Sequence, residues 1–412
     1  MMLSSKERVA RSMACGANSR RDSGAPSPLP DRVPCFCQLA IGHYLLRSGL
    51  APFDVWYRSE AFAEALVGMA RRYRFDGILV NLPGRDPDVE RHVDRIERRD
   101  GEDVIRWKPG GFTVLPHDDN PHYFQNDGTR FFPRFEDVDP EALHYVEPWD
   151  TTDVTYPTRW GFEPNPRPVS AFFPEHHFDT IRHVLAKSGG SLSVHSEVFS
   201  PFSQFLELLN YEAALLALLD DPAKVHACLA ALAEGAVDLA CRQAACGVDA
   251  VLISSAFAGG GLISREHYQE FVLPYEARVV TAVRTRHPST FIYTHTCGAI
   301  GDRLDLMLAT GTQGIDTLDP PPLGTVELAD AKRALGGKAF IKGNVDPVNT
   351  VLRGNPPTVR QAAADRIAIA KPGGGFILST ACSVAPHAPP ENILALAEAV
   401  EDLGGYENDV KL

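Results

Sequence analysis

Short apolar β-type runs alternate with amphipathic helical stretches from residue 191 onward, and this alternation limits the fold more than any other feature. Strands that alternate with helices along a chain predict a parallel sheet built from βα units. Eight strands in this pattern fit a closed barrel, so we predict an α/β fold of the (β/α)₈ TIM-barrel type. The eight candidate strands cover residues 33–39, 76–81, 192–197, 248–254, 290–295, 313–318, 339–343 and 375–380.

Residues that typically mark the ends of helices support the helices predicted between these strands. Asp221-Pro222 supplies a capping side chain and a first-turn proline ahead of residues 223–245, and Gly247 follows that stretch. Capping residues before a helix and glycine after it mark its two ends. Ser264 opens another predicted helix in the same way.

Residues 100–170 interrupt the alternation. They are rich in Pro, Gly, Asp and aromatic residues, among them Trp107, Phe112 and Tyr123. We expect an insertion of β-hairpins and loops that packs over one end of the barrel as a lid or wall. The predicted organisation is a single barrel domain over 31–405 that includes this insertion. It is preceded by a partly flexible N-terminal extension, 1–30, with a short exposed helix at 6–11, and followed by a tail at 406–412.

The composition of the chain limits the kinds of partner that it is expected to bind. The 412 residues carry a formal net charge of -13, which argues against non-specific nucleic-acid binding and, more weakly, against polyanionic substrates. Eight scattered Cys lack the spacing of a disulfide framework, so we expect a cytoplasmic protein. No run approaches the roughly 20 apolar residues that cross a bilayer, so no membrane partner is expected.

Three residues suggest metal chemistry. His295 and Cys297 end one apolar run, and Cys382 follows another far along the chain. One imidazole and two thiolates are three of the four ligands that zinc prefers, and they leave one position open. The carboxyl ends of barrel strands meet on one face, so these side chains are expected to converge there. The plainer alternative is that the cysteines are core hydrophobes and the histidine is only hydrogen-bonded.

Further candidates follow other strands. Asp316 is a candidate fourth zinc ligand, for which Asp319 or a substrate atom is the alternative. Glu197 and Asn344 are candidate catalytic residues on the same face, although a carboxylate there could pair with an arginine and Asn344 could serve as a turn residue. Gly259-Gly-Gly261 is predicted to be a mobile loop near the pocket, because it lacks the pattern of a nucleotide site.

Several segments in order resemble the uroporphyrinogen decarboxylase superfamily over most of residues 31–405. Within it, the chain is similar to the zinc-dependent, corrinoid-linked methyltransferases typified by methylcobalamin:coenzyme M methyltransferases. The segments that carry the resemblance are Asp31-Arg-Val-Pro34, Pro201-Phe-Ser203, Asp221-Pro222, Leu273-Pro-Tyr275, His295-Thr-Cys297-Gly298, Gly343-Asn-Val-Asp-Pro347, Gly374-Gly-Phe-Ile-Leu378, Cys382, Pro386 and Pro390-Glu-Asn392.

The resemblance separates two activities. Decarboxylases of the superfamily carry an arginine-containing Met-Arg-Gln-Ala-Gly-Arg segment and an Asp after the second strand, whereas this chain has Gln38-Leu-Ala-Ile-Gly-His43 and Val80-Asn-Leu-Pro83. The methyltransferase branch carries the zinc pattern matched by His295, Cys297 and Cys382. The resemblance therefore implies methyl transfer between a corrinoid, methylcobalamin, and a thiol or a methoxy or methylthio substrate, with zinc activating the heteroatom.

No Asp-x-His-x-x-Gly segment is present, so the cobalamin is expected on a separate corrinoid protein. The alternatives are a cofactor-free decarboxylase of the uroporphyrinogen type and a non-catalytic barrel that binds a tetrapyrrole or corrinoid. The sequence names neither the methyl donor nor the acceptor, nor the direction of transfer. It leaves the oligomeric state open, with a homodimer as one option.

Overall fold

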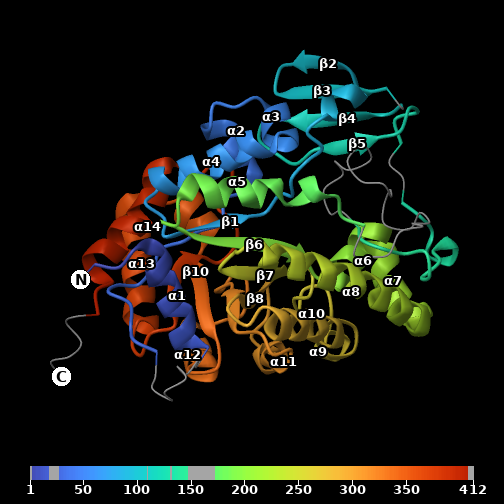
Figure 1. The fold of residues 1–412 in the computed structure, drawn as a ribbon. Coiled ribbons are helices and arrows are strands. Elements are labelled where there is room, and N and C mark those ends of the chain that lie inside the picture. The colour runs from blue at the N-terminus through green and yellow to red at the C-terminus, as the bar shows by residue number, and fades with distance from the viewer. Residues whose placement is uncertain (1, 18–26, 109, 130–131, 147–171, 407–412) are drawn as a thin grey trace.

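A curled parallel sheet forms the centre of the computed structural model, which describes residues 2–17, 27–108, 110–129, 132–146 and 172–406 (Figure 1). Its seven strands run in the order β1-β6-β7-β8-β9-β10-β11, and every neighbouring pair is parallel. The fold is therefore TIM-barrel-like, as the alternation predicted. The strands are β1 (Gly77–Val80), β6 (Ser193–Phe199), β7 (Ala250–Ser254), β8 (Phe291–Thr296), β9 (Gly314–Thr317), β10 (Phe340–Val345) and β11 (Phe376–Thr380).

The predicted first strand, 33–39, lies between β11 and β1 but forms only isolated bridges. Cys35 bridges to Leu378, and the Asp76 amide donates to the Cys35 carbonyl at 2.8 Å. The segment thus fills the eighth position of the barrel without a continuous ladder. Pro34 gives a physical reason, because proline has no N–H to donate to a neighbouring strand.

Helices cover the outside of the sheet, and two of them begin at the predicted capping residues. The Asp221 side chain accepts from the Lys224 amide at 3.0 Å, and the Ser264 side chain caps its helix in the same way. The helices are α1 (Ser5–Gly16), α2 (Ile41–Arg47), α3 (Pro52–Tyr57), α4 (Ser59–Arg72), α5 (Asp179–Ser188), α6 (Pro201–Leu209), α7 (Tyr211–Asp220), α8 (Pro222–Ala245), α9 (Arg265–His267), α10 (Leu273–Arg286), α11 (Leu304–Ala309), α12 (Leu328–Leu335), α13 (Pro356–Ala370) and α14 (Pro390–Leu403), with short 3₁₀ turns at Val89–His92, Phe135–Asp137 and Glu175–Phe178 and π turns at Tyr268–Val272 and Pro347–Leu352.

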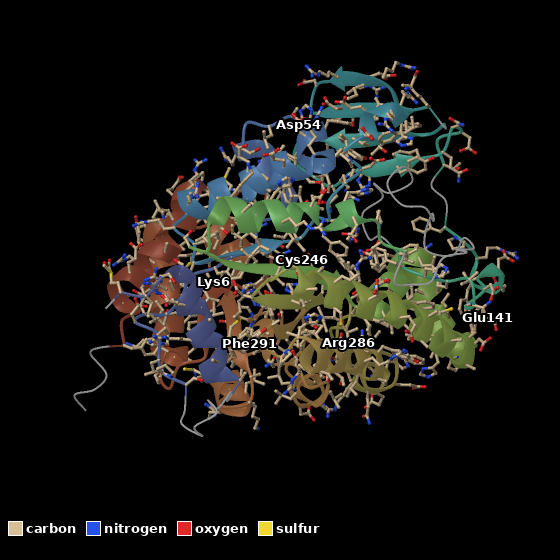
Figure 2. All side chains as sticks on the ribbon, viewed as in Figure 1. Lys6, Asp54, Glu141, Cys246, Arg286 and Phe291 are labelled. Atoms are coloured by element: carbon tan, nitrogen blue, oxygen red, sulfur yellow. The ribbon has the colours of Figure 1, made fainter. Side chains whose placement is uncertain are left out.

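Helix α1 packs against the starts of the strands, at the end of the barrel away from the candidate ligands. The prediction of an exposed helix near the N-terminus is wrong for one face, since Val9 and Met13 are fully buried in a cluster with side chains of β7, β8 and β10. Lys6 on α1, labelled in Figure 2, pairs with Asp249 just before β7 at 3.0 Å. Helix α1 therefore covers the end of the barrel at which the strands begin, opposite the end that carries the candidate ligands.

A second, antiparallel sheet forms the predicted insertion at the top of Figure 1, where Trp107 packs against Tyr57 of α3. It starts earlier than the predicted boundary at residue 100, and the part at 147–170 lies outside the described residues. Asp118, just after the third of its strands, pairs with His387 at 2.9 Å, which ties the insertion to the loop before α14. Its strands are β2 (Val93–Arg99), β3 (Glu102–Trp107), β4 (Phe112–Pro116) and β5 (His122–Phe124).

Among the described residues, every helix is too short or too polar to cross a bilayer.

Glu276 on α10 is a carboxylic acid enclosed by the helix layer. It is fully buried, and the Tyr268 hydroxyl donates to its Oε2 at 3.3 Å. Burial raises the pKa of Glu276 to about 7, because the charged form loses its hydration.

The Glu276 carboxyl should make stability depend on pH. A folded-state pKa above the unfolded value means that the folded chain holds the proton more tightly, so its contribution is full below about pH 4.5 and is lost as the pH rises through about 7. We expect the free energy of unfolding to fall by on the order of 3 kcal/mol across this window, and Glu276→Gln to flatten the fall. Urea titrations at several pH values measure this, with the exposed Glu64→Gln as control; an unchanged pH slope in Glu276→Gln would contradict it.

Truncation of Met13 tests the packing of α1 against the strand starts. Since Met13 is fully buried, Met13→Ala should lower the free energy of unfolding by about 2–4 kcal/mol through lost burial and a residual cavity. Met2→Ala, which removes a side chain that is 92% exposed, is the matched control and should change little. Equal stabilities of the two variants would show that α1 does not contribute to the core.

Candidate metal centre

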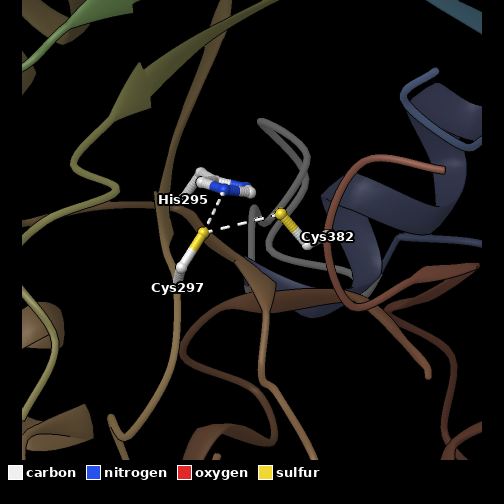
Figure 3. A group of neighbouring side chains, drawn as sticks. All are labelled: His295, Cys297 and Cys382. Atoms are coloured by element: carbon white, nitrogen blue, oxygen red, sulfur yellow. Dashed lines mark hydrogen bonds between the residues drawn. The ribbon is translucent and has the colours of Figure 1, made fainter. Parts of the chain in front are cut away.

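His295, Cys297 and Cys382 meet at the carboxyl end of the barrel (Figure 3). His295 Nε2 lies 3.2 Å from Cys297 Sγ, and the two sulfurs lie 3.6 Å apart. All three ligand atoms lie within 4.8 Å of one another. Zn–S bonds of about 2.3 Å and Zn–N bonds of about 2.0 Å at tetrahedral angles place such atoms about 3.5–3.8 Å apart. The two measured distances, from Cys297 Sγ to His295 Nε2 and to Cys382 Sγ, therefore match those of a zinc site to within a few tenths of an ångström.

The three side chains share protons in a way that favours a thiolate at Cys382 and a protonated thiol at Cys297, because the hydrogen bond with Cys382 and burial raise the pKa of Cys297 well above its usual value. Hydrogen bonding with Cys297 lowers the pKa of Cys382 well below that of a free thiol, and His295 adds to the effect. Burial alone would lower the pKa of His295, but Asp316 and Cys382 together raise it to about 10. A thiolate is the form of cysteine that binds a metal, so the site is prepared for a cation.

The structure places Asp316 behind His295, away from the sulfurs. Its Oδ2 lies 3.4 Å from His295 Nδ1, and Thr317 Oγ1 lies 2.8 Å from the same nitrogen. Once a cation displaces the proton from Nε2, an Nδ1–H that donates to these oxygens would leave the Nε2 lone pair directed at the cysteines. Asp316, expected as a fourth ligand, is thus positioned to orient the imidazole instead.

Lys342 completes this arrangement inside the barrel. Its Nζ lies 2.9 Å and 3.0 Å from the two Asp316 carboxylate oxygens, and both side chains are almost fully buried. Although burial works in the opposite direction, Lys342 and His295 lower the pKa of Asp316. The carboxylate therefore stays ionised, which keeps it an acceptor for His295.

The loop that carries Cys297 is held by close backbone packing. Gly298 adopts a positive φ of 77° and its amide donates to Asp319 Oδ2 at 2.6 Å. Asp319, the alternative fourth ligand, is thereby engaged with the loop backbone. A Cβ on Gly259 would lie 2.2 Å from the Cys297 carbonyl oxygen. The glycine run that is predicted to be a mobile loop therefore packs closely, at Gly259, against the backbone of the candidate ligand Cys297.

A cavity of about 400 Å³ opens beside the three ligands. Strand ends, helices α6 and α7 and the insertion all contribute to its wall, so residues far apart in sequence enclose one space. The lining residues are Gln38, Asn120, Pro121, His122, Glu197, Phe199, Glu207, Tyr211, Ser254, Ala256, Phe257, His295, Cys297, Cys382 and Ser383.

The two candidate catalytic residues occupy different positions. Glu197 lines the cavity, and burial raises its pKa to about 7. Asn344 is buried beside β9, where its Nδ2 donates to the Leu318 carbonyl at 2.8 Å, and it is not among the lining residues. Glu197 can therefore exchange a proton in the pocket. Asn344 instead bonds to the backbone that follows β9.

Sequence reasoning missed Lys342, Glu207 and Tyr211. Lys342 sits inside an apolar strand, and a charged residue in a strand that should be buried on both faces is a signal that could have found it. Glu207 and Tyr211 lie in ordinary helical patterns, and no local signal in the sequence distinguishes them.

Substitution of Gly259 tests the packing beneath Cys297. Gly259→Ala forces the Cys297 carbonyl to move, so zinc affinity should fall by about 10-fold or more without loss of any ligand, as in other sites whose support is disturbed. Gly261→Ala is the matched control, because no atom of the described residues lies within 4 Å of the position that its Cβ would take. Competition against a chelator measures both affinities, and equal values would contradict the supporting role of Gly259.

Comparisons with known proteins identify the family of the chain. The family model described as uroporphyrinogen decarboxylase (URO-D) matches residues 165–403, which include Glu197 and all three candidate metal ligands. Uroporphyrinogen decarboxylase from Thioalkalivibrio sulfidiphilus is 32% identical over 192 residues, which cover 45% of this chain and 51% of that protein. The corresponding enzyme from Alkalilimnicola ehrlichii is 29% identical over 235 residues, 55% of this chain and 61% of that protein.

The alignments thus span only about half to three-fifths of these relatives. Among solved structures, a methyltransferase from Methanosarcina mazei superposes with a TM-score of 0.66 at 17% sequence identity, covering 97% of this chain and 99% of that one. That likeness shows a shared fold. Since the family model covers more than half of the 412 residues, the chain belongs to the uroporphyrinogen decarboxylase family.

Proposed function

We propose that this protein is a zinc-dependent methyltransferase that moves a methyl group between a corrinoid and a thiol, methoxy or methylthio substrate. The observation that carries the proposal is the cluster of His295 Nε2 and the two sulfurs of Cys297 and Cys382 within 4.8 Å beside a cavity. The fold shared with a methyltransferase from Methanosarcina mazei supports the same reaction class.

The donor set fits zinc by its chemistry as well as its spacing. Two thiolates and one neutral imidazole are soft or borderline ligands, and three protein ligands leave room for a substrate atom. Bound zinc would supply a Lewis acid that keeps a substrate thiol deprotonated at neutral pH.

Metal binding, orientation of the imidazole and proton transfer are assigned to different residues of the chain. Cys297 and Cys382 hold the metal, and Asp316 keeps His295 in the tautomer that can do so. Glu197, whose pKa of about 7 suits proton exchange near neutrality, accepts the proton that the substrate thiol releases. The cavity walls would hold the substrate sulfur within reach of the methyl carbon, because displacement requires an in-line approach.

The proposal includes cobalamin carried by a partner corrinoid protein, which would supply or accept the methyl group. Methylcobalamin would supply an electrophilic methyl group for the substrate thiolate, and the electron pair of its Co–C bond would remain with the corrinoid. In the opposite direction, the same residues would ease the departure of a methoxy or methylthio heteroatom.

A cofactor-free decarboxylase is the second candidate, favoured by the names of the relatives. A uroporphyrinogen carries many carboxylates, yet the described lining of the cavity includes neither lysine nor arginine. Paired thiols beside the pocket also have no role in that reaction. The methyltransferase is therefore the better match to the site.

Metal analysis tests the proposal. The purified protein should contain about one zinc per chain, and a variant with both Cys297→Ser and Cys382→Ser should contain almost none, because each change removes a thiolate ligand. Methyl transfer from methylcobalamin to a thiol should disappear in parallel, by at least about 100-fold. Cys246→Ser, which changes a half-buried cysteine outside the cluster, should retain both.

Absence of zinc from the wild-type protein would overturn the methyltransferase. Release of carbon dioxide from a uroporphyrinogen by that zinc-free protein would instead establish the decarboxylase. Tetrapyrrole binding without turnover would indicate the non-catalytic barrel.

A further inference from the structure

One wall of the cavity combines a carboxylate with two aromatic rings. Tyr211 at the start of α7 and Phe257 after β7 form an edge-to-face pair with ring centroids 5.0 Å apart. The Tyr211 hydroxyl donates to Glu207 Oε1 on α6 at 3.4 Å. All three line the cavity that contains the metal ligands. Tyr211 is 45% exposed and lines the cavity, so part of the residue remains available to a ligand.

The charge of the cavity favours cations over anions. Two thiolates balance the charge of a divalent ion, so a metal at the cluster leaves no excess positive charge for a substrate. Glu207 adds a carboxylate to the wall, and among the described lining residues none is lysine or arginine. A sulfonate or carboxylate on the substrate would therefore lose hydration without meeting a lysine or arginine among these residues.

We propose that Glu207, Tyr211 and Phe257 form a subsite for an ammonium group, so that the substrate is a small amine-bearing thiol or methylated compound. This inference rests on the proposed function for its sulfur or methoxy chemistry, but the subsite itself is defined by the three side chains. Aromatic faces attract a cation through their quadrupole, and a neighbouring carboxylate adds direct attraction. Burial and Glu207 raise the pKa of Tyr211 to about 12, so its hydroxyl stays neutral and keeps donating to Glu207.

A matched series of thiols tests the subsite on the zinc-loaded protein. The probes are 2-aminoethanethiol, 2-mercaptoethanol and 2-mercaptoethanesulfonate, which differ mainly in carrying a positive, zero or negative charge. With methylcobalamin as donor, we expect the KM to rise in that order. Glu207→Gln should raise the KM for the aminothiol by about three- to tenfold and leave the neutral thiol unchanged. Comparison of variant with wild type cancels the different intrinsic reactivities of the thiols.

Glu212→Gln is the matched control, because Glu212 is an exposed carboxylate in the first turn of α7 that does not line the cavity. A second measurement needs neither metal nor turnover: binding of tetramethylammonium, followed by ligand-observed NMR, should weaken in Glu207→Gln and persist in Glu212→Gln. Binding that is unaffected by Glu207→Gln would overturn the subsite.

The two measurements separate the subsite from the proposed function. Methyl transfer that prefers the sulfonate, or is indifferent to charge, would overturn the subsite and leave the methyltransferase standing. Absence of methyl transfer to all three thiols, together with Glu207-dependent binding of tetramethylammonium, would overturn the methyltransferase and retain the subsite. Failure of both readouts would overturn both.

Discussion

The parallel hydrogen-bonding register between β8 and β9 holds the candidate metal centre together. It places His295 directly beside Asp316 across the two strands, and it directs the imidazole towards the cysteines. Side chains on a strand alternate between faces, so a slip of one residue would turn His295 out of the barrel. The pairings of β8 with β7 on one side and β9 on the other fix this register.

A buried chain of charges runs from this register into the barrel interior. Lys342, Asp316 and His295 lie in contact beneath the pocket, and the lysine also stands 5.0 Å from the centre of the Phe36 ring. Burial of an ion pair costs desolvation, which its own attraction repays only in part. The arrangement is therefore better explained as a device that fixes the charge and tautomer of the candidate metal ligand than as a source of stability.

The candidate metal ligands and the other residues of the cavity wall come from different parts of the molecule. The cluster of His295, Cys297 and Cys382 lies at and just beyond the carboxyl ends of β8 and β11, within the span that matches the family model. The insertion contributes His122 and its neighbours to the wall, and helices α6 and α7 contribute Glu207 and Tyr211. Rigid strand ends suit a metal site that tolerates little displacement, whereas helices and loops can differ between relatives and so change the substrate.

Local patterns in the sequence were enough to predict the parallel barrel, through the alternation of apolar runs with capped helices, and to predict the residue types of the candidate metal centre. Such patterns report which segments are buried strands and which residues follow them. The folded chain was needed to show that Cys382 meets Cys297 across 85 positions of sequence, that Asp316 lies behind His295, and that Tyr211 faces Phe257. These contacts depend on register, strand order and helix packing, which arise from the whole chain closing on itself and leave no mark at any single segment.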